Sequence, residues 1–236
     1  MESHYSSPYP RRTIKSWTKR EHGINPTDRE WMKNHPNYTS SLAEITTRLT
    51  QEHLANRTIF LDIGCGDGQS LLQLAQWAPE ALVLGVETHT PGVLNALQKA
   101  ESLKVQNIAF FHGDILDLLT HSTQSFHFDR IHIYFSDPWP KKRHHKRRLM
   151  QESFLGKILS KLSPTGLIHI ATDWEHYAQE ISERLEQIKA HTPIDIRSQH
   201  PESAAIFQRE PTKYERKAFK EGRQVFEFYI RKHDIF

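Results

Sequence analysis

The residues whose side chains are best suited to a chemical function lie at positions 133–148. An apolar run there ends in Phe-Ser-Asp-Pro-Trp-Pro, and a basic octapeptide follows. Pro138 and Pro140 restrict the backbone, so we expect Asp137 on a stiff turn. An Asp can accept hydrogen bonds from the edge of a nucleobase while a neighbouring ring such as Trp139 stacks on its face, and cations can hold phosphates. The stretch therefore predicts a base-reading site beside a phosphate-binding one.

The octapeptide concentrates the positive charge of the chain. Residues 141–148, Lys-Lys-Arg-His-His-Lys-Arg-Arg, hold six of the 31 Lys and Arg and no acid, whereas the net charge of the whole chain is only +3. A second basic tract spans residues 209–223, and the N-terminal segment adds Arg11, Arg12, Lys15, Lys19 and Arg20. Such runs favour a polyanionic partner, although a solvated surface is an equally good interpretation of one basic octapeptide.

Three glycines indicate a ligand loop. Gly64, Gly66 and Gly68 follow the apolar run 59–63 and precede a helical pattern, where glycine allows both a sharp turn and close approach of a ligand. Glycines also serve simple turns, which is the alternative. Glu87 ends the next apolar run, where a carboxylate can accept hydrogen bonds from both hydroxyls of an adenosine ribose. An exposed acid at the end of a strand is the alternative for Glu87.

Two further acids indicate the charge of the ligand. Asp114 follows the apolar run 108–112 and can either contact an adenine or cap the next helix. Asp62, just before Gly64, would attract a sulfonium and an amino group and would repel a diphosphate, unless it only caps the glycine turn. The dinucleotide fingerprint Gly-x-Gly-x-x-Gly also places its third glycine one residue later than Gly68. The layout therefore resembles class I methyltransferases that use S-adenosylmethionine more than it resembles dehydrogenases.

The order of elements predicts the fold that must position these residues. Short β-rich apolar runs alternate with amphipathic segments of helical length, which is typical of βα units in a mainly parallel sheet. We expect an α/β domain with a doubly wound, Rossmann-like, seven-stranded and mostly parallel sheet and helices on both faces. The resemblance to class I methyltransferases implies an antiparallel C-terminal strand. The expected strands cover residues 59–63, 82–86, 108–112, 130–135, 167–171, 193–197 and 225–230.

The first 40 residues show no clear period and contain four prolines. We therefore expect residues 1–40 to form a basic N-terminal arm with little regular structure, ahead of a class I methyltransferase domain over residues 41–236.

Composition excludes several classes of protein. No apolar run approaches the roughly 18 residues of a membrane-spanning helix, and the N-terminus lacks the apolar stretch of a secretory signal. We therefore expect a cytoplasmic protein. Cys65 is the only cysteine, which excludes an intramolecular disulfide and a multi-cysteine zinc site. The 16 histidines show no spacing such as His-Glu-x-x-His, so no metal is expected.

With these motifs taken together, the chain resembles the tRNA (guanine-N7-)-methyltransferase family. The family signature is Phe-(Pro/Ser)-Asp-Pro-Trp-x-Lys followed by a basic run, as in residues 135–148 here. Similarity extends to Ala-Thr-Asp-Trp-Glu at 171–175, to Pro-Thr-Lys-Tyr-Glu-Arg at 211–216 and to the basic segment 11–16. Residues 24–56 match least.

The resemblance implies a set of site residues. The cofactor side would comprise Asp62, Gly64, Gly66, Gly68, Glu87, Asp114 and Asp137, with Asp137 also catalytic. The substrate side would comprise Lys141, Arg143, His144, His145, Lys146, Arg147, Arg148, Asp173, Thr212, Lys213, Tyr214 and Glu215. Two of these residues depart from the usual family form, because Asp62 stands where Glu is common and Tyr214 where Phe is common. The shorter Asp62 puts its direct contact with the cofactor in question.

The implied reaction is transfer of a methyl group from S-adenosylmethionine to guanine N7 in tRNA, with position 46 of the variable loop as the target. Guanine N7 holds a lone pair and no proton, so no general base is needed and positioning should dominate. A carboxylate of Asp137, Asp173 or Glu215 would hold the N1 and N2 edge of the base. The partner is tRNA, no obligatory protein partner is implied, and the chain would act as a monomer or homodimer. The alternatives are a methyltransferase for a small molecule or protein and a non-catalytic RNA-binding module.

Overall fold

The computed structural model describes residues 24–121, 126–198, 207 and 210–233. The cations predicted in the N-terminal arm, and Arg209, lie outside these residues. Within the described part, each helix is too short or too polar to cross a membrane.

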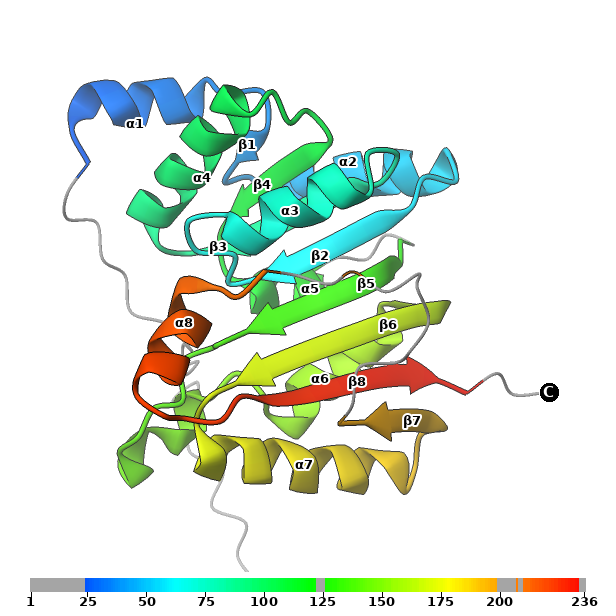
Figure 1. The fold of residues 1–236 in the computed structure, drawn as a ribbon. Helices are drawn as coiled ribbons and strands as arrows, with labels where there is room; N and C mark the ends of the chain where they lie inside the picture. Colours follow the sequence, from blue (N-terminus) through cyan, green and yellow to red (C-terminus); the bar gives the residue numbers. More distant parts are fainter. Residues whose placement is uncertain (1–23, 122–125, 199–206, 208–209, 234–236) are drawn as a thin grey trace, which may run out of the picture.

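A single sheet of eight strands forms the centre of the fold, in the order β1-β4-β3-β2-β5-β6-β8-β7 (Figure 1). The parallel pairs run from β1 to β6, whereas β8 is antiparallel to both of its neighbours. The predicted fold class is confirmed, with one strand more than expected. The strands are β1 (Tyr38–Thr39), β2 (Ile59–Ile63), β3 (Leu82–Glu87), β4 (Ile108–His112), β5 (Phe128–Tyr134), β6 (Leu162–Thr172), β7 (Ile194–Arg197) and β8 (Phe226–Lys232).

Helices cover both faces of the sheet because side chains alternate between the faces along each strand. In β2, Leu61 packs in one buried cluster with residues of α2, α5, α6 and α7, whereas Phe60 packs in a second cluster with residues of α1, α3 and α4. The helices are α1 (Pro26–Lys33), α2 (Leu42–Leu54), α3 (Gln69–Trp77), α4 (Thr90–Ser102), α5 (Ile115–His121), α6 (Glu152–Ser160), α7 (Glu175–Lys189) and α8 (Lys213–Lys220), with a 3₁₀ helix η1 (Lys142–Arg147).

The predicted boundary of the N-terminal arm is wrong for residues 24–40. The side chain of Asn25 accepts a hydrogen bond from the Asp28 amide, and Pro26 opens α1, which buries Met32 against the sheet. Tyr38 then pairs with β4 as the eighth strand. These residues are therefore part of the folded domain.

Parallel pairing places the carboxyl ends of β2 to β6 at one edge of the sheet, where the arrowheads of Figure 1 gather. Because β8 runs the other way, α8, which precedes it, also lies at this edge. In open α/β sheets, ligands bind outside the carboxyl ends of the strands. The fold thus brings the glycine loop, the Asp137 turn and α8 together.

Candidate active site

A cavity of about 430 Å³ opens at the carboxyl edge of the sheet. Gly64, Gly66, Glu87, Asp114 and Asp137 all line it, so the structure brings together five of the seven residues predicted to bind a cofactor. The wall is completed by α8, through Lys213 and Tyr214. A smaller cavity of about 40 Å³ adjoins it and is lined by Asp62 and Thr212, among others.

The glycine loop owes its shape to backbone conformations that other residues avoid. All three glycines have positive φ, at 72° for Gly64, 55° for Gly66 and 78° for Gly68. A Cβ on Gly66 would meet nothing within 4 Å, whereas one on Gly68 would lie 2.6 Å from the Cβ of Ala96 in α4. Gly66 therefore leaves room in the cavity wall, while Gly68 permits close packing of the loop against α4 and lies outside the described residues that line the cavity.

The carboxylate of Glu87 orders the loop beside it. It accepts hydrogen bonds from the amides of Gly66 at 3.0 Å, Thr88 at 2.7 Å and His89 at 2.8 Å. Glu87 is half-buried, so the alternative of a merely exposed strand-end acid is wrong. Glu87 lies in the cavity wall, where the expected contact with a ribose is possible. That contact stays a prediction.

Asp62 and Asp114 are both buried, at 2% and 9% exposure. Asp114 Oδ1 accepts a hydrogen bond from the Leu116 amide at 2.9 Å, so the helix-capping alternative is confirmed. Because Asp114 also lines the cavity, capping and a contact with the adenine remain compatible. Asp62 borders the smaller cavity below the glycine loop.

Asp67 connects the glycine loop to two helices, a link that was not predicted from the sequence. It forms ion pairs with Lys99 of α4 at 3.1 Å and with Lys213 of α8 at 3.7 Å. Burial by itself would raise the pKa of Asp67, but the hydrogen bond from Lys99 and the charge of Lys213 lower that pKa overall. The sequence offers no local signal for this bridge, because both lysines lie far along the chain from Asp67.

The turn that carries Asp137 is strained on both sides. Phe135 and Trp139 adopt left-handed conformations, with φ of 52° and 42°, which large side chains rarely adopt. The Phe135 amide donates to the Ala171 carbonyl at 2.8 Å, which holds the end of β5 to β6. Asp137 is exposed at the cavity rim. The prolines indicated a stiff turn, but no sequence signal pointed to the two left-handed residues.

Trp139 lies between the cavity and the basic octapeptide. Its ring lines the cavity, the guanidinium carbon of Arg147 lies 5.0 Å from its centroid, and the His144 ring meets it edge-on at 5.7 Å. The indole Nε1 is buried without a hydrogen-bond partner among the described residues. Residues 142–147 of the octapeptide form η1, and Lys141, which precedes it, is exposed together with Lys142, Arg143 and Lys146.

Arg148 belongs to the octapeptide but is buried, which argues against its predicted contact with RNA. It is 2% exposed, and its Nε donates to the Pro138 carbonyl at 2.7 Å. It also forms an ion pair with Glu180 of α7. A side chain enclosed in this way is not available to a phosphate.

The remaining predicted substrate residues have partners of their own. Asp173 forms an ion pair with Arg223. Thr212 and Glu215 form a capping box at the start of α8, in which Thr212 Oγ1 accepts from the Glu215 amide at 3.2 Å and Glu215 Oε2 accepts from the Thr212 amide at 3.3 Å. Neither Asp173 nor Glu215 belongs to the described residues that line the larger cavity.

Comparison with known proteins identifies the family. The family profile described as "Putative methyltransferase" matches residues 56–228. A tRNA (guanine-N(7)-)-methyltransferase of Nitrosococcus oceani is 35% identical over 224 residues, which cover 94% of this chain and 92% of that protein. One of Shewanella frigidimarina is 33% identical, over 92% of this chain and 90% of that protein. The chain belongs to the tRNA (guanine-N(7)-)-methyltransferase family.

A solved structure supports the same fold for this family member. Precorrin-6y C5,15-methyltransferase of Geobacter metallireducens superimposes with a TM-score of 0.51 at 12% identity, over 85% of this chain and 91% of that one. At this identity the likeness concerns the fold alone. Among the residues that the structure of this chain describes, no three His, Cys, Asp or Glu side chains gather in a way that could hold a metal ion.

Proposed function

We propose that this chain transfers a methyl group from S-adenosylmethionine to N7 of a guanine in tRNA, the target being the variable-loop guanine at position 46. The observation that carries the proposal is the position of Trp139. This residue lines an acid-walled cavity and also contacts Arg147 and His144 of the basic turn. A site suited to a cationic cofactor therefore opens directly beside a surface suited to a polyanion.

The cavity lining fits the proposed cofactor. A volume of about 430 Å³ lies within the range of roughly 300 to 1,000 Å³ that is usual for ligand pockets. Glu87 Oε1 accepts from two amides, whereas Oε2 accepts only from the Gly66 amide and keeps a lone pair for a ribose hydroxyl. Asp114 and the neighbouring Ile115 would hold the adenine, and Asp62 would lie near the charged end. When bound, S-adenosylmethionine supplies an electrophilic methyl group on a positively charged sulfur.

Asp137 is the carboxylate we assign to the guanine. Of the three candidates, Asp173 is paired with Arg223 and Glu215 caps α8, whereas Asp137 lines the cavity. It would accept hydrogen bonds from the N1 and N2 edge and so orient N7 toward the methyl donor. Because the base gains positive charge as the methyl group is transferred, a fixed carboxylate attracts the product-like state more strongly than the substrate.

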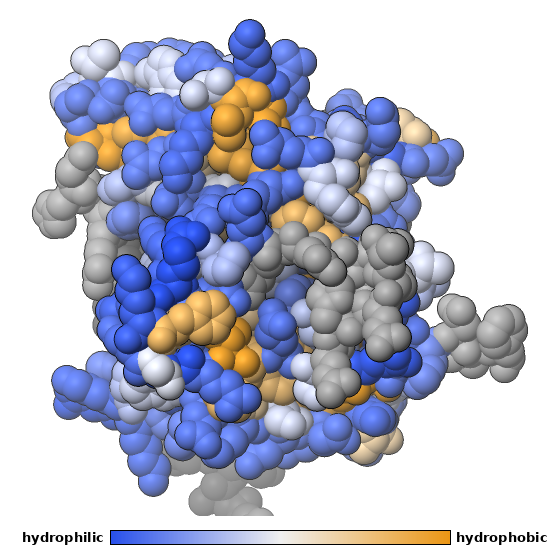
Figure 2. Space-filling view, in the orientation of Figure 1, coloured by the Kyte–Doolittle hydropathy of each residue, from blue (hydrophilic) through white to orange (hydrophobic). Residues whose placement is uncertain are grey.

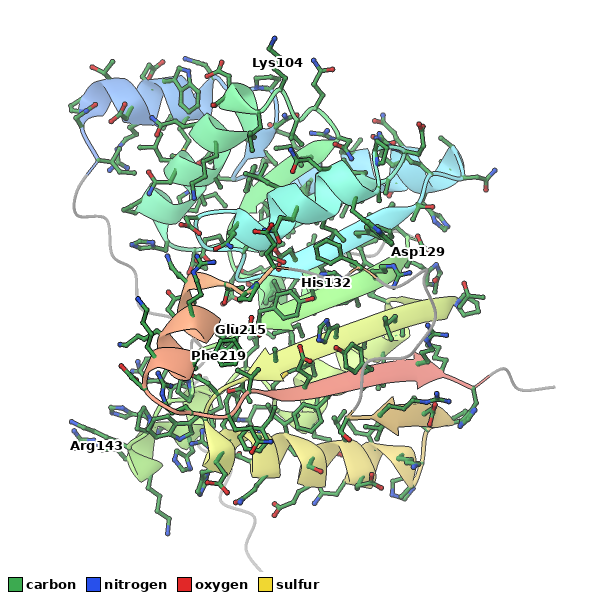
Figure 3. The ribbon with its side chains drawn as sticks, viewed as in Figure 1. Lys104, Asp129, His132, Arg143, Glu215 and Phe219 are labelled. Atoms are coloured by element: carbon green, nitrogen blue, oxygen red, sulfur yellow. The ribbon has the colours of Figure 1, made fainter. Side chains whose placement is uncertain are left out.

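Two basic surfaces flank the cavity mouth and would hold the RNA backbone. One is the exposed part of η1, and the other is the outer face of α8, which exposes Lys217 and Lys220 beside Phe219. Figure 3 places Arg143 and Phe219 at the same edge of the molecule, and Figure 2 shows an apolar patch over α8 bordered by hydrophilic surface. Phe219 is 56% exposed, and an exposed ring among lysines is suited to stacking on an unpaired base.

Methyl transfer to unmodified tRNA, measured with a tritiated methyl donor and followed by nucleoside mapping, tests the proposal. It identifies donor, acceptor and atom together. The expected product is N7-methylguanine at position 46. Asp137→Asn keeps the side-chain shape and removes its charge, and it should lower kcat by roughly a hundredfold. Normal turnover of this variant at saturating cofactor and tRNA would exclude the assigned part for Asp137.

The RNA surface is tested separately by salt dependence. Arg143→Ala should reduce the slope of log affinity for tRNA against log salt by about 0.7 to 0.9, the contribution of one phosphate contact. The matched control is Lys189→Ala, an exposed cation at the far end of α7, which should leave the slope unchanged. Equal slopes for wild type and Arg143→Ala would contradict the placement of RNA on η1.

The alternatives give different results in the same assays. A methyltransferase for a small molecule or protein would bind the cofactor but leave bulk tRNA unlabelled. A non-catalytic RNA-binding module would bind tRNA without a calorimetric signal from S-adenosylmethionine. Because tRNA is the proposed substrate, we place the protein in the cytosol, acting as a monomer or homodimer without an obligatory protein partner.

A further inference from the structure

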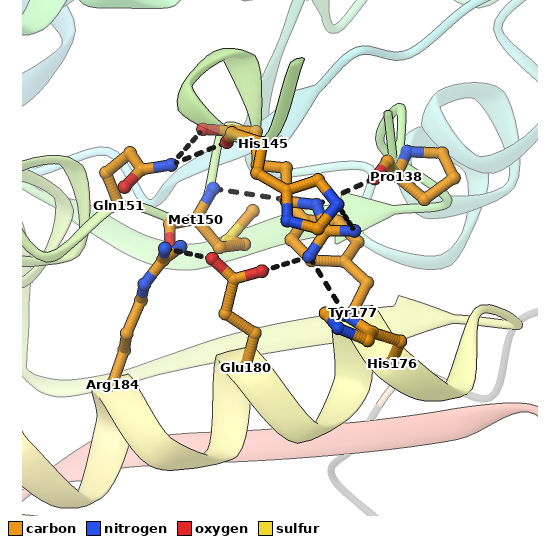
Figure 4. Close-up of polar contacts among 9 residues, drawn as sticks. Pro138, His145, Met150, Gln151, His176, Tyr177, Glu180 and Arg184 are labelled. Carbon is orange, nitrogen blue, oxygen red and sulfur yellow. Dashed lines mark hydrogen bonds and ion pairs between the residues drawn. The ribbon is translucent and has the colours of Figure 1, made fainter. Parts of the chain in front are cut away.

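Arg148 is enclosed on all sides although it ends a run of exposed cations. Nε donates to the Pro138 carbonyl at 2.7 Å, and Nη2 lies 3.0 Å from His145 Nε2. Nη1 forms the ion pair with Glu180 and lies 3.3 Å from His176 Nδ1. Each nitrogen of the guanidinium thus has a polar partner, and these partners converge in Figure 4.

The surroundings of Arg148 are held by α7. The guanidinium lies over the ring of Tyr177, 5.0 Å from its centroid, and Tyr177 Oη accepts from the Met150 amide at 3.1 Å. Glu180 is shared with Arg184, which donates to the Met150 carbonyl. The backbone that follows η1 is therefore fastened to α7 on one side while Arg148 reaches back to Pro138 on the other.

Stability alone does not account for this arrangement. Burying an arginine and its carboxylate partner is costly, and an apolar pair of similar volume is often as stable or more so. An apolar side chain, however, cannot bond the Pro138 carbonyl. That carbonyl belongs to the residue between Asp137, at the cavity rim, and Trp139, in the cavity wall.

We propose that Arg148 is a positioning residue, which fixes the Asp137–Trp139 turn through the Pro138 carbonyl and seats η1 on α7 through His145. The inference rests on the proposed function for its effect on turnover. It also reassigns His145, which bonds Arg148 from within η1 and is half-buried, from RNA contact to support. Arg148 and His145 hold the inner side of η1 against α7, so the exposed cations of η1 face outward.

The test uses Arg148→Met combined with Glu180→Gln. Both charges of the pair are removed together. The contact of residue 180 with Arg184 is preserved because the glutamine amide still offers an acceptor oxygen. We expect thermal unfolding near that of the wild type, and kcat at saturating cofactor and tRNA at least tenfold lower, because small displacements of positioned groups can cost about a hundredfold in rate. Wild-type kcat in a folded double variant would overturn the proposal.

Two measurements distinguish a positioning role of Arg148 from a phosphate-binding role and from a purely structural role. The salt slope of tRNA binding should not change in the double variant, whereas a lost phosphate contact would reduce it by about 0.7 to 0.9. The Phe135 and His144 amides donate to the Ala171 and Lys141 carbonyls on either side of the turn, and their protection from hydrogen exchange should fall in the double variant but not in Arg143→Ala. Unchanged exchange at these amides, or a reduced slope, would overturn the proposal.

Single variants complete the design. Guanidinium ion added to Arg148→Ala should restore part of the lost kcat, and Arg148→Lys should remain impaired because an ammonium lacks the planar fork. If Arg148→Ala does not fold, the double variant still tests whether Arg148 positions the turn. A wild-type chain that fails to methylate tRNA would refute the proposed function, and the exchange experiment would still test the inference.

Discussion

Alanine at Gly66 and at Gly68 should damage the protein in different ways. Both glycines have left-handed φ, which costs an L-residue about 1–2 kcal/mol. At Gly66 the added methyl group meets nothing within 4 Å, so that backbone cost is the whole effect on stability. At Gly68 it lies 2.6 Å from Ala96 Cβ, and such overpacking costs about 1–3 kcal/mol more. For a chain of this size, each kcal/mol shifts Tm by about 2–4 °C.

Thermal unfolding and calorimetry with S-adenosylhomocysteine measure the two effects. Gly68→Ala should unfold about 2–12 °C below Gly66→Ala, the shift that the extra 1–3 kcal/mol predicts. Gly66→Ala should lose more cofactor affinity, because its methyl group enters the open space beside the cavity. Ala96→Gly alone should lower the free energy of unfolding by about 1 kcal/mol, the usual cost in a helix. In the Gly68→Ala background it should lower the free energy of unfolding by less, or raise it, because it removes the methyl group that the new side chain meets. Equal Tm values for the two alanine variants, or additive effects of Gly68→Ala and Ala96→Gly, would refute the reasoning.

Three further predictions concern single side chains. Burial raises the pKa of the Cys65 thiol well above its usual range, so iodoacetamide should label the native chain far more slowly than the urea-unfolded chain; rapid native labelling, seen by mass, would contradict the burial. Loss of hydration, followed by the charges of Arg143 and Arg147, lowers the pKa of His144 below 6.5. His144 therefore gains charge only as pH falls through that lowered value, and filter binding from about pH 7.5 to about pH 5.5 should show tRNA affinity rising at the acidic end, less so in His144→Gln. Thr212→Ala removes the cap of α8 and should lower the free energy of unfolding by about 1 kcal/mol in urea titrations; no change would show that the capping box contributes nothing.

The sheet and the glycine loop were predictable because their signals are local. Parallel strands such as β2 are buried on both faces and appear as continuous apolar runs, and the spacing of the glycines marks the turn that follows. Helix α1 was missed because it is largely polar, although Asn25 followed by Pro26 is a start signal that could have revealed it. The strand expected over residues 167–171 left out Pro164, whereas β6 begins at Leu162 and includes this proline, where the pairing with β5 shifts register.

The site residues were predictable by type but not by environment. The sequence of the octapeptide cannot distinguish Arg148 from Arg147, because the difference comes from Tyr177 and Glu180, about thirty positions away on α7. Arg148 is therefore buried because of partners that are distant in the chain. The capping box of Glu215, in contrast, has a local signal, because Thr212 stands three residues before it.

The place of β8 has a consequence for how the chain is made. This strand lies between β6 and β7, both of which precede it in the chain. Until β8 has emerged from the ribosome, the eleven-residue strand β6 has no neighbour on that side, and unpaired strand edges favour self-association. Chains interrupted before β8 should therefore aggregate instead of surviving as partly active fragments, and the growing polypeptide would benefit from a chaperone until this strand is in place.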